Sequence, residues 1–155
     1  MELFGDWIKP EWMLSIFADI RYFPQHTFIF LTKQPQNLIK WSPFPRNYWV
    51  GVTATDGDMF VKAMDCLLEV KAEIKFISFE PLLNWHIEAY ILEGGLKAQQ
   101  LDWLIIGAQT KPYKPPKIEW VQEIELAAAK AKIPIFEKDN LQPLLGRELI
   151  QEMPK

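Results

Sequence analysis

Polar side chains that can bind ligands or exchange protons recur in this sequence at the points where short apolar runs end. The clearest case is the run 74–82, in which apolar residues lead directly to Glu80 and Pro81. Glu80 with Lys33 or Lys138 could form a general acid–base pair, or simply an ion pair, which is the simpler interpretation. The polar residues that follow apolar runs are Thr32, Lys33, Thr53, Thr55, Ser78, Glu80, Gln109, Thr110, Glu137, Lys138, Asp139 and Asn140.

Several other chemistries lack the residues that they need. His26 and His86 have no neighbouring His, Asp or Glu at metal-ligand spacing, so neither is assigned to a metal. Gly94-Gly95 lacks the lysine and following helix of a phosphate-binding loop, and the sequence contains no serine nucleophile elbow. The single cysteine, Cys66, excludes an internal disulfide and a cysteine-based metal site, and its apolar helical surroundings predict a small buried residue.

The run 74–82 predicts a strand buried on both faces. Ile74, Phe76, Ser78 and Glu80 alternate onto one face, and the residues between them, mostly apolar, onto the other. Apolar residues on both faces are typical of a parallel strand covered by other elements. Glu80 then lies at the carboxyl end of the strand, and Pro81 ends the ladder because it has no N–H to donate.

The remaining sequence predicts strands and helices that alternate along the chain. Asp58 is the predicted N-cap of the helix 59–71, and Gly94-Gly95 is predicted to end a weaker segment, 84–96, read as a short helix or an irregular excursion. The other predicted strands are 26–33, 48–55, 101–109 and 133–138, and the other predicted helices are 10–22, 35–41, 118–131 and 141–153.

Such alternation predicts a parallel sheet with right-handed crossovers, in a single α/β domain over residues 1–155. An eight-unit barrel takes about 250 residues. We therefore expect an open parallel sheet of about five strands, an incomplete (half) TIM-type barrel. Because an open sheet leaves apolar edges, we also predict a homodimer that covers an edge or the open mouth, and the seven tryptophans favour this weakly.

In a parallel sheet, the carboxyl ends of the strands lie along one rim, where ligands bind in this architecture. Glu80 shares a face with Ser78, Gln109 with Gly107, and Thr53 with Gly51, and small residues beneath polar tips suggest room for a ligand. In the alternative interpretation, these are ordinary strand-end residues that meet water and cap helices. The predicted ligand-binding residues are Lys33, Thr53, Ser78, Glu80, Gln109, Lys138 and Asn140.

Composition limits the partners and the location. The 155 residues are 49% hydrophobic and 24% charged, with a formal net charge of -3, so the chain shows no basic excess for nucleic acid. The N-terminus does not resemble a signal peptide, and no apolar run approaches the length of a membrane span. We therefore expect a cytoplasmic protein that does not bind membranes.

Five segments together resemble an uncharacterised phage and prokaryotic family with radical-SAM-like barrels. The Leu-Thr-Lys motif ending at Lys33 and the Glu-Pro-Leu-Leu motif beginning at Glu80 are the most specific parts, and the likeness runs through nearly the whole chain. Gln109 departs from the Gly-Glu-Ser found in many relatives, which puts its role in doubt. The segments are Pro24–Pro35, Asn47–Thr53, Phe76–Leu83, Leu101–Gly107 and Ile133–Asn140.

The resemblance implies S-adenosylmethionine and a [4Fe–4S] cluster for complete family members, whose three clustered cysteines lie upstream of the region seen here. It implies that Lys33, Thr53, Glu80, Gln109 and Lys138 line the cofactor or substrate side. Cys66 alone cannot hold a cluster, so we expect no cofactor on this chain and no radical chemistry from it alone.

Three functions remain open at this point. The chain could be the C-terminal half of a radical-SAM-like barrel, either as a truncated open reading frame or as a subunit completed by a separately encoded N-terminal half. It could instead be a small-molecule module that binds S-adenosylmethionine or a nucleotide at the rim. Or it could be a nucleic-acid-associated accessory protein, against which the acidic balance argues.

Overall fold

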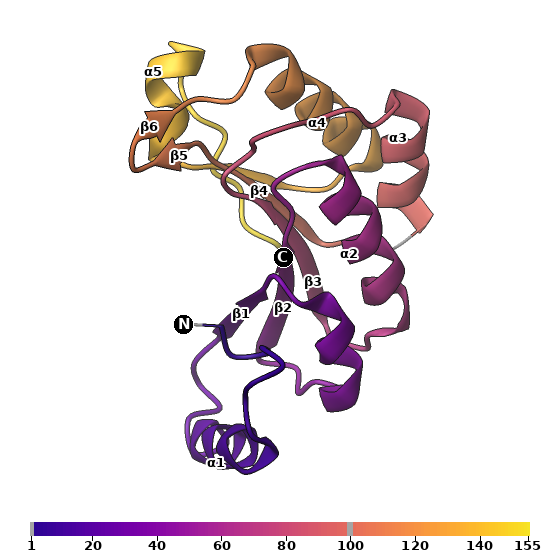
Figure 1. Ribbon diagram of the computed structural model, residues 1–155, viewed down its shortest axis with the longest axis vertical. Helices are drawn as coiled ribbons and strands as arrows, with labels where there is room; N and C mark the ends of the chain where they lie inside the picture. The colour runs from indigo at the N-terminus through magenta and orange to yellow at the C-terminus, as the bar shows by residue number, and fades with distance from the viewer. Residues whose placement is uncertain (1, 99–100) are drawn as a thin grey trace.

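A computed structural model describes residues 2–98 and 101–155, and its centre is a sheet of five parallel strands. The strands lie side by side in chain order, and every neighbouring pair is parallel, as the alternation of elements predicts (Figure 1). In order across the sheet, they are β1 (Phe28–Thr32), β2 (Tyr48–Thr53), β3 (Ile74–Phe79), β4 (Trp103–Ile106) and β7 (Ile135–Glu137).

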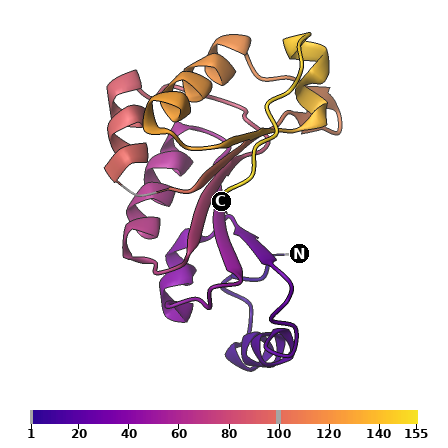
Figure 2. The same ribbon diagram turned by 180° about the vertical axis from the view of Figure 1, so that it is seen from behind.

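The helices that connect these strands cover one face of the sheet. Figures 1 and 2 show α2, α3 and α4 together on that face, with α1 packed at one end and the opposite face free of helices. One-sided coverage is expected when consecutive parallel strands are joined by crossovers of the same hand. The helix bounds are Pro10–Ile20 (α1), Gly57–Glu69 (α2), Ala89–Ala98 (α3) and Ile118–Ala131 (α4).

The main core lies between the sheet and these helices. Alternate strand residues point into it, including Val50 and Val52 of β2 and Ile77 and Phe79 of β3, and all four are buried. Phe79 contacts Phe60 of α2, with ring centroids 5.8 Å apart. Since side chains alternate along a strand, Ser78 and Glu80 must lie on the face without helices.

The predicted cap of α2 is wrong by two residues. The helix begins at Gly57, and the N-cap is Asp56, whose Oδ1 accepts a hydrogen bond from the backbone N–H of Met59 at 2.9 Å. Asp58 lies inside the first turn, where its negative charge faces the positive end of the helix dipole. Both aspartates suit a helix start, and only the backbone path selects Asp56.

Gly94-Gly95 does not end a helix, contrary to the prediction, because α3 continues through both residues to Ala98. Each glycine costs a helix about 1 kcal/mol relative to alanine. Leu92 and Leu96 are both buried in the core, and their packing holds the helix together across the glycines. Tertiary burial therefore outweighs local propensity here.

The fourth strand is shorter than predicted and ends at Ile106. Gln109 instead belongs to β5 (Gln109–Thr110), which pairs antiparallel with β6 (Tyr113–Lys114) in a separate small hairpin. The segment between the predicted strand 101–109 and the predicted helix 118–131 therefore contains the second strand of this hairpin.

The predicted helix 141–153 is also wrong. Only η2 (Asp139–Leu141) and one turn, α5 (Gln142–Leu145), are helical, and Gly146 adopts a left-handed φ of 59° that ends the turn. The chain then extends along β7, where Gln151 forms an antiparallel bridge with Phe136. The short helix predicted at 35–41 is present as the 3-10 helix η1 (Pro35–Trp41).

Within residues 2–98 and 101–155, no helix combines the length and apolar character needed to cross a membrane.

Candidate functional site

Several aromatic side chains lie together on the face of the sheet that no helix covers. Trp103 of β4 lies at the centre of this aromatic cluster, with ring-centroid distances of 5.4 Å to Phe76, 6.0 Å to Trp49 and 6.0 Å to Phe136. The indole N–H of Trp103 donates to the backbone oxygen of Glu152 at 2.8 Å, which ties the C-terminal segment to the same face. The open face thus has an apolar floor below the rim of strand ends.

The two glycines on this face do not leave empty space, contrary to the prediction. A Cβ atom on Gly51 would lie 2.2 Å from the Phe76 ring, and one on Gly107 would lie 3.0 Å from Cγ of Glu80. Each glycine therefore leaves room for a larger neighbouring side chain, Phe76 of β3 at Gly51 and Glu80, just after β3, at Gly107. Gly107 holds Glu80 close to the end of β4, which orients the carboxylate along the rim.

Glu80 and Lys138 form an ion pair at the rim. Lys138 Nζ lies 2.9 Å from Glu80 Oε1, and the two side chains are 43% and 27% exposed. The sequence suggested Lys33 or Lys138 as the partner of Glu80, and the structure brings Lys138 to it. Both groups retain hydrogen-bonding capacity, since an ammonium has three donors and a carboxylate can accept several bonds.

Ser78 lies directly below this pair and has an unsatisfied hydroxyl. Its side chain is 1% exposed, and Oγ has no hydrogen-bond partner among the described residues. Its neighbour in the ladder is Thr53, which is also buried and lies on the same face. Most buried polar atoms are hydrogen-bonded, and among the described residues Ser78 Oγ shares its lack of a partner with Tyr48 Oη and Trp85 Nε1 in the core.

The other predicted site residues already have structural partners nearby. Lys33 follows the last residue of β1, its backbone N–H donates to Glu2 Oε2 at 2.8 Å, and the residue is exposed. Gln109 Nε2 donates to the backbone oxygen of Pro112 at 3.1 Å, inside its own hairpin. Asn140 binds both backbone groups of Ala108 at 2.9 Å, so its side chain fixes the loop after β4.

A charged cluster that the sequence did not predict lies on the helix side of β7. Glu137 is fully buried, and Arg147 reaches it with two hydrogen bonds of 2.8 and 2.9 Å while also contacting Glu125 at 2.7 Å. The backbone N–H of Ile150 donates to Glu137 at 2.7 Å. The cluster therefore fastens the C-terminal segment to the sheet. Glu137 appeared among the strand-end polar residues, but no pattern linked it to Arg147.

Burial and neighbouring charges shift the pKa values of the two carboxyl groups of this cluster, Glu125 and Glu137, in opposite directions. Burial, and then the neighbouring Glu137, raise the pKa of Glu125 to about 7. Burial alone would raise the pKa of Glu137, but its hydrogen bonds to Arg147 and Ile150 outweigh this and lower it. Glu137 is thus the ionised partner of Arg147, and Glu125 titrates near neutrality.

Two cavities lie at the amino ends of the strands, away from the rim. One, of about 730 Å³, is bounded by residues at the starts of β3, β4 and β7 and by the C-terminal segment. The other, of about 540 Å³, lies beside Phe44 and Lys75, and Asp102 lines both. Burial lowers the pKa of Lys75 and raises that of Asp102, but Asp102 accepts the backbone N–H of Lys75 at 2.8 Å, which is a structural role.

A comparison with protein families matches residues 1–142 to a family described as "Protein of unknown function (DUF5131)". The chain belongs to this family. No curated protein and no solved structure matches the chain. Membership in the DUF5131 family thus establishes a relationship and assigns no activity.

The residues present do not fit an iron–sulfur cluster. Such clusters are held by several thiolates, and the sequence contains only Cys66. Cys66 lies on α2, on the helix side of the sheet, where it is half-buried rather than fully buried as predicted, and burial raises the pKa of its thiol. In the described part of the chain, no three His, Cys, Asp or Glu side chains are grouped to hold a metal ion.

Proposed function

We propose that the rim around Glu80 and Lys138 binds a small zwitterionic ligand of the S-adenosylmethionine class, as part of a barrel-like site built on the open face. The observation that carries the proposal is the accessible ion pair of Glu80 and Lys138 at the rim, with the unpartnered hydroxyl of the buried Ser78 on the same face. A rim of strand ends is where ligands bind in parallel α/β sheets.

The ion pair suits the two charges of an α-amino acid. The ligand ammonium would bind Glu80, and its carboxylate would bind Lys138, so that each protein charge gains a partner of opposite sign at hydrogen-bonding distance. Because both side chains remain partly exposed, the ligand can reach them without unfolding the rim.

We further propose that this sheet is the C-terminal half of a radical-SAM-like barrel. The support is the strand order, with five parallel strands in sequence and their helices on one face, which is also the local arrangement of a TIM-type barrel. A cluster that cleaves S-adenosylmethionine would need thiolates from outside these 155 residues, for example from a complementary N-terminal half. The chain described here contributes the binding of the ligand, not the cluster chemistry.

Calorimetric titration of the purified chain with S-adenosylmethionine tests the proposal, with L-methionine and adenosine titrated separately. We expect binding of S-adenosylmethionine and a weaker signal from L-methionine, since methionine carries both charges that the ion pair recognises. Adenosine alone, which lacks them, should bind least.

Two variants, Glu80→Gln and Lys138→Met, should each weaken binding of S-adenosylmethionine at least about tenfold, the effect of losing about 1.4 kcal/mol. Arg46→Met is the matched control because Arg46 forms an exposed ion pair with Glu73 at the opposite end of the strands. Unchanged affinity in both rim variants, combined with loss of binding in Asp102→Asn, would refute the rim and assign the ligand to the cavities.

A further inference from the structure

The two edges of the sheet, formed by β7 and β1, differ in whether another part of the chain covers them. At the β7 edge, Glu137 N donates to Ile150 O at 2.7 Å and Glu152 N donates to Ile135 O at 2.8 Å, so the C-terminal segment covers that edge. At the other edge, β1 pairs with β2 and with no other strand of the described chain. An uncovered strand edge presents unpaired backbone groups, which are a template for pairing with another chain.

The direction of each backbone group on β1 follows from one hydrogen bond. Phe28 N donates to Asn47 O at 2.9 Å, toward β2. Because these directions alternate along a strand, the N–H and C=O groups of Ile29 and Leu31 point away from β2, toward the open edge. The side chains of the same two residues are 51% and 41% exposed on the face without helices. The edge is therefore both unpaired and apolar.

We propose that a second copy of this chain pairs with β1 across a two-fold axis at Phe30, forming one continuous ten-stranded sheet from two five-stranded sheets. The pairing is antiparallel, so Ile29 of each copy lies opposite Leu31 of the other. Both residues direct their backbone groups outward, so the two opposing pairs exchange four backbone hydrogen bonds. The apolar side chains of the two copies then cover one another on the same face.

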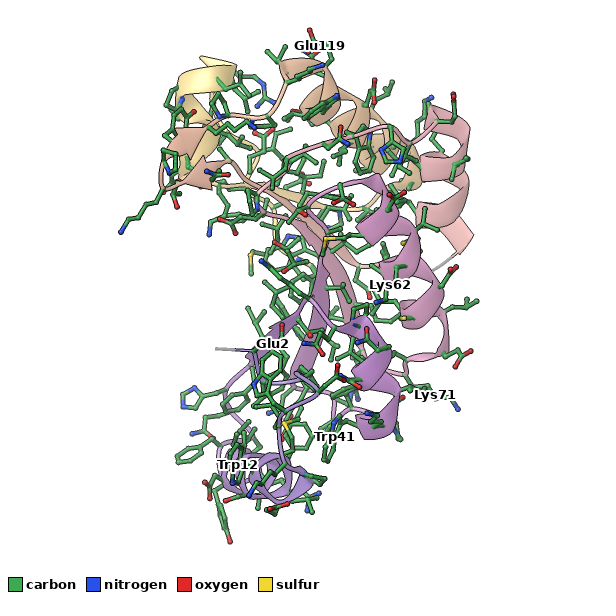
Figure 3. All side chains as sticks on the ribbon, in the orientation of Figure 1. Glu2, Trp12, Trp41, Lys62, Lys71 and Glu119 are labelled. Carbon is green, nitrogen blue, oxygen red and sulfur yellow. The ribbon has the colours of Figure 1, made fainter. Side chains whose placement is uncertain are left out.

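A second copy fits this edge because, in antiparallel pairing, the β1 edge of one copy offers the backbone groups that the β1 edge of the other copy needs. The strand offers the same two outward residues to either side of Phe30, and a two-fold axis needs such an isologous surface. Phe4 packs against Phe30 on the helix side with ring centroids 5.9 Å apart, but the Glu2 carboxylate reaches the open edge, where it accepts the backbone N–H of Lys33, so the free part of this edge ends at Leu31. Figure 3 shows Glu2 beside β1 and far from Lys62 on α2.

The charges at the ends of the strand are also compatible with this register. Lys33 would lie opposite Thr27 of the second copy, and the Glu2 carboxylate, which accepts the backbone N–H of Lys33, would come near His26 of that copy. Glu2 is an acidic residue and His26 a basic one, so this contact brings no like charges together.

Light scattering or sedimentation of the purified full chain measures the oligomeric state. We expect a mass twice the 18.2 kDa of one chain, falling to one chain in Leu31→Lys and in Leu31→Pro. Proline removes only the outward N–H, which edge strands tolerate, so circular dichroism should be unchanged. Leu126→Lys, at an exposed leucine of α4, is the matched control and should remain dimeric. A wild-type mass of one chain at high micromolar concentration, or dissociation of the control as well, would overturn the proposal.

Disulfide trapping tests the register. In a Cys66→Ser background, the double variant Ile29→Cys/Leu31→Cys should cross-link two copies on oxidation, since opposing hydrogen-bonded residues are about 5.5 Å apart at Cα, within disulfide range. The single variants should not cross-link, because residue 29 faces residue 31 and not itself. Efficient cross-linking of either single variant would contradict the axis at Phe30. These measurements use no ligand, so their outcome is independent of binding at the rim; they concern the chain without a complementary half, because strands added by such a half would occupy the same β1 edge.

Discussion

Replacing Arg147 by methionine probes what fastens the C-terminal segment to the sheet. Arg147 is the only cation that contacts Glu137 in the described chain, and Glu137 is fully buried. The variant Arg147→Met keeps much of the side-chain volume but leaves the Glu137 carboxylate with the backbone N–H of Ile150 as its main donor. A charge without its counterion in a buried position is strongly unfavourable.

The size of the effect follows from the burial of the two partners. Removing one member of a buried ion pair costs about 3–5 kcal/mol, because the remaining charge stays buried. The Arg147 side chain is 39% exposed, so water can approach the cluster, and we expect the lower end of that range, about 3 kcal/mol. With a urea dependence of about 2 kcal/mol/M, the unfolding midpoint should fall by about 1.5 M.

Urea unfolding at several pH values provides the assay. The folded-state pKa of Glu137 is lowered, so its contribution to stability is present above its unfolded pKa and is lost as pH falls through the folded value. The variant lacks most of this contribution, so the difference between variant and wild type should shrink in acid. The control is Arg46→Met, whose exposed ion pair with Glu73 should leave the midpoint unchanged. Equal midpoints for both variants at neutral pH would refute the buried-pair reasoning.

Three further outcomes are expected. The free energy of unfolding should fall as pH rises from about 4.5 to about 7, by at most about 1.4 kcal/mol per pH unit, because folded Glu125, with a pKa of about 7, keeps a proton that the unfolded chain releases. In urea titrations at several pH values, Glu125→Gln should make this dependence on pH weaker, and an unaltered dependence would disprove the assignment to Glu125. Gly51→Ala should cost about 1–3 kcal/mol, measured by thermal unfolding, because the new Cβ would meet the Phe76 ring at 2.2 Å. Asp56→Ala should cost about 1 kcal/mol by losing the bond to Met59 N, while Asp58→Ala should cost less, and the reverse order would restore the predicted cap.

Strand positions and their common direction could be predicted from the sequence because both depend on local patterns. Apolar runs such as Ile74–Phe79 and their alternation with helical segments determine a parallel sheet through handedness and hydrogen-bonding rules alone. The placement of Glu80 at a strand end follows from the same run, since proline at the next position cannot continue the ladder. These features need no knowledge of distant residues.

Helix limits depended on distant packing and were predicted less well. The helix α3 continues through Gly94-Gly95 because Leu92 and Leu96 are buried by the core, which no local propensity reports. The C-terminal segment was predicted as a helix from its apolar spacing, yet beyond Leu145 it extends along β7. There, bonds from Arg147 and Ile150 to the buried Glu137 outweigh helix propensity.

The sequence by itself determined the direction of the strands and the residues at their carboxyl ends, because alternation and proline act on neighbouring residues. Only the tertiary structure decided that Lys138, and not Lys33, pairs with Glu80, and that Ser78 is left without a partner. It also decided that glycines at 51 and 107 accommodate Phe76 and Glu80 and do not leave open space. These are contacts between strands, set by register and side-chain volume, and neither quantity is encoded in any single stretch of the chain.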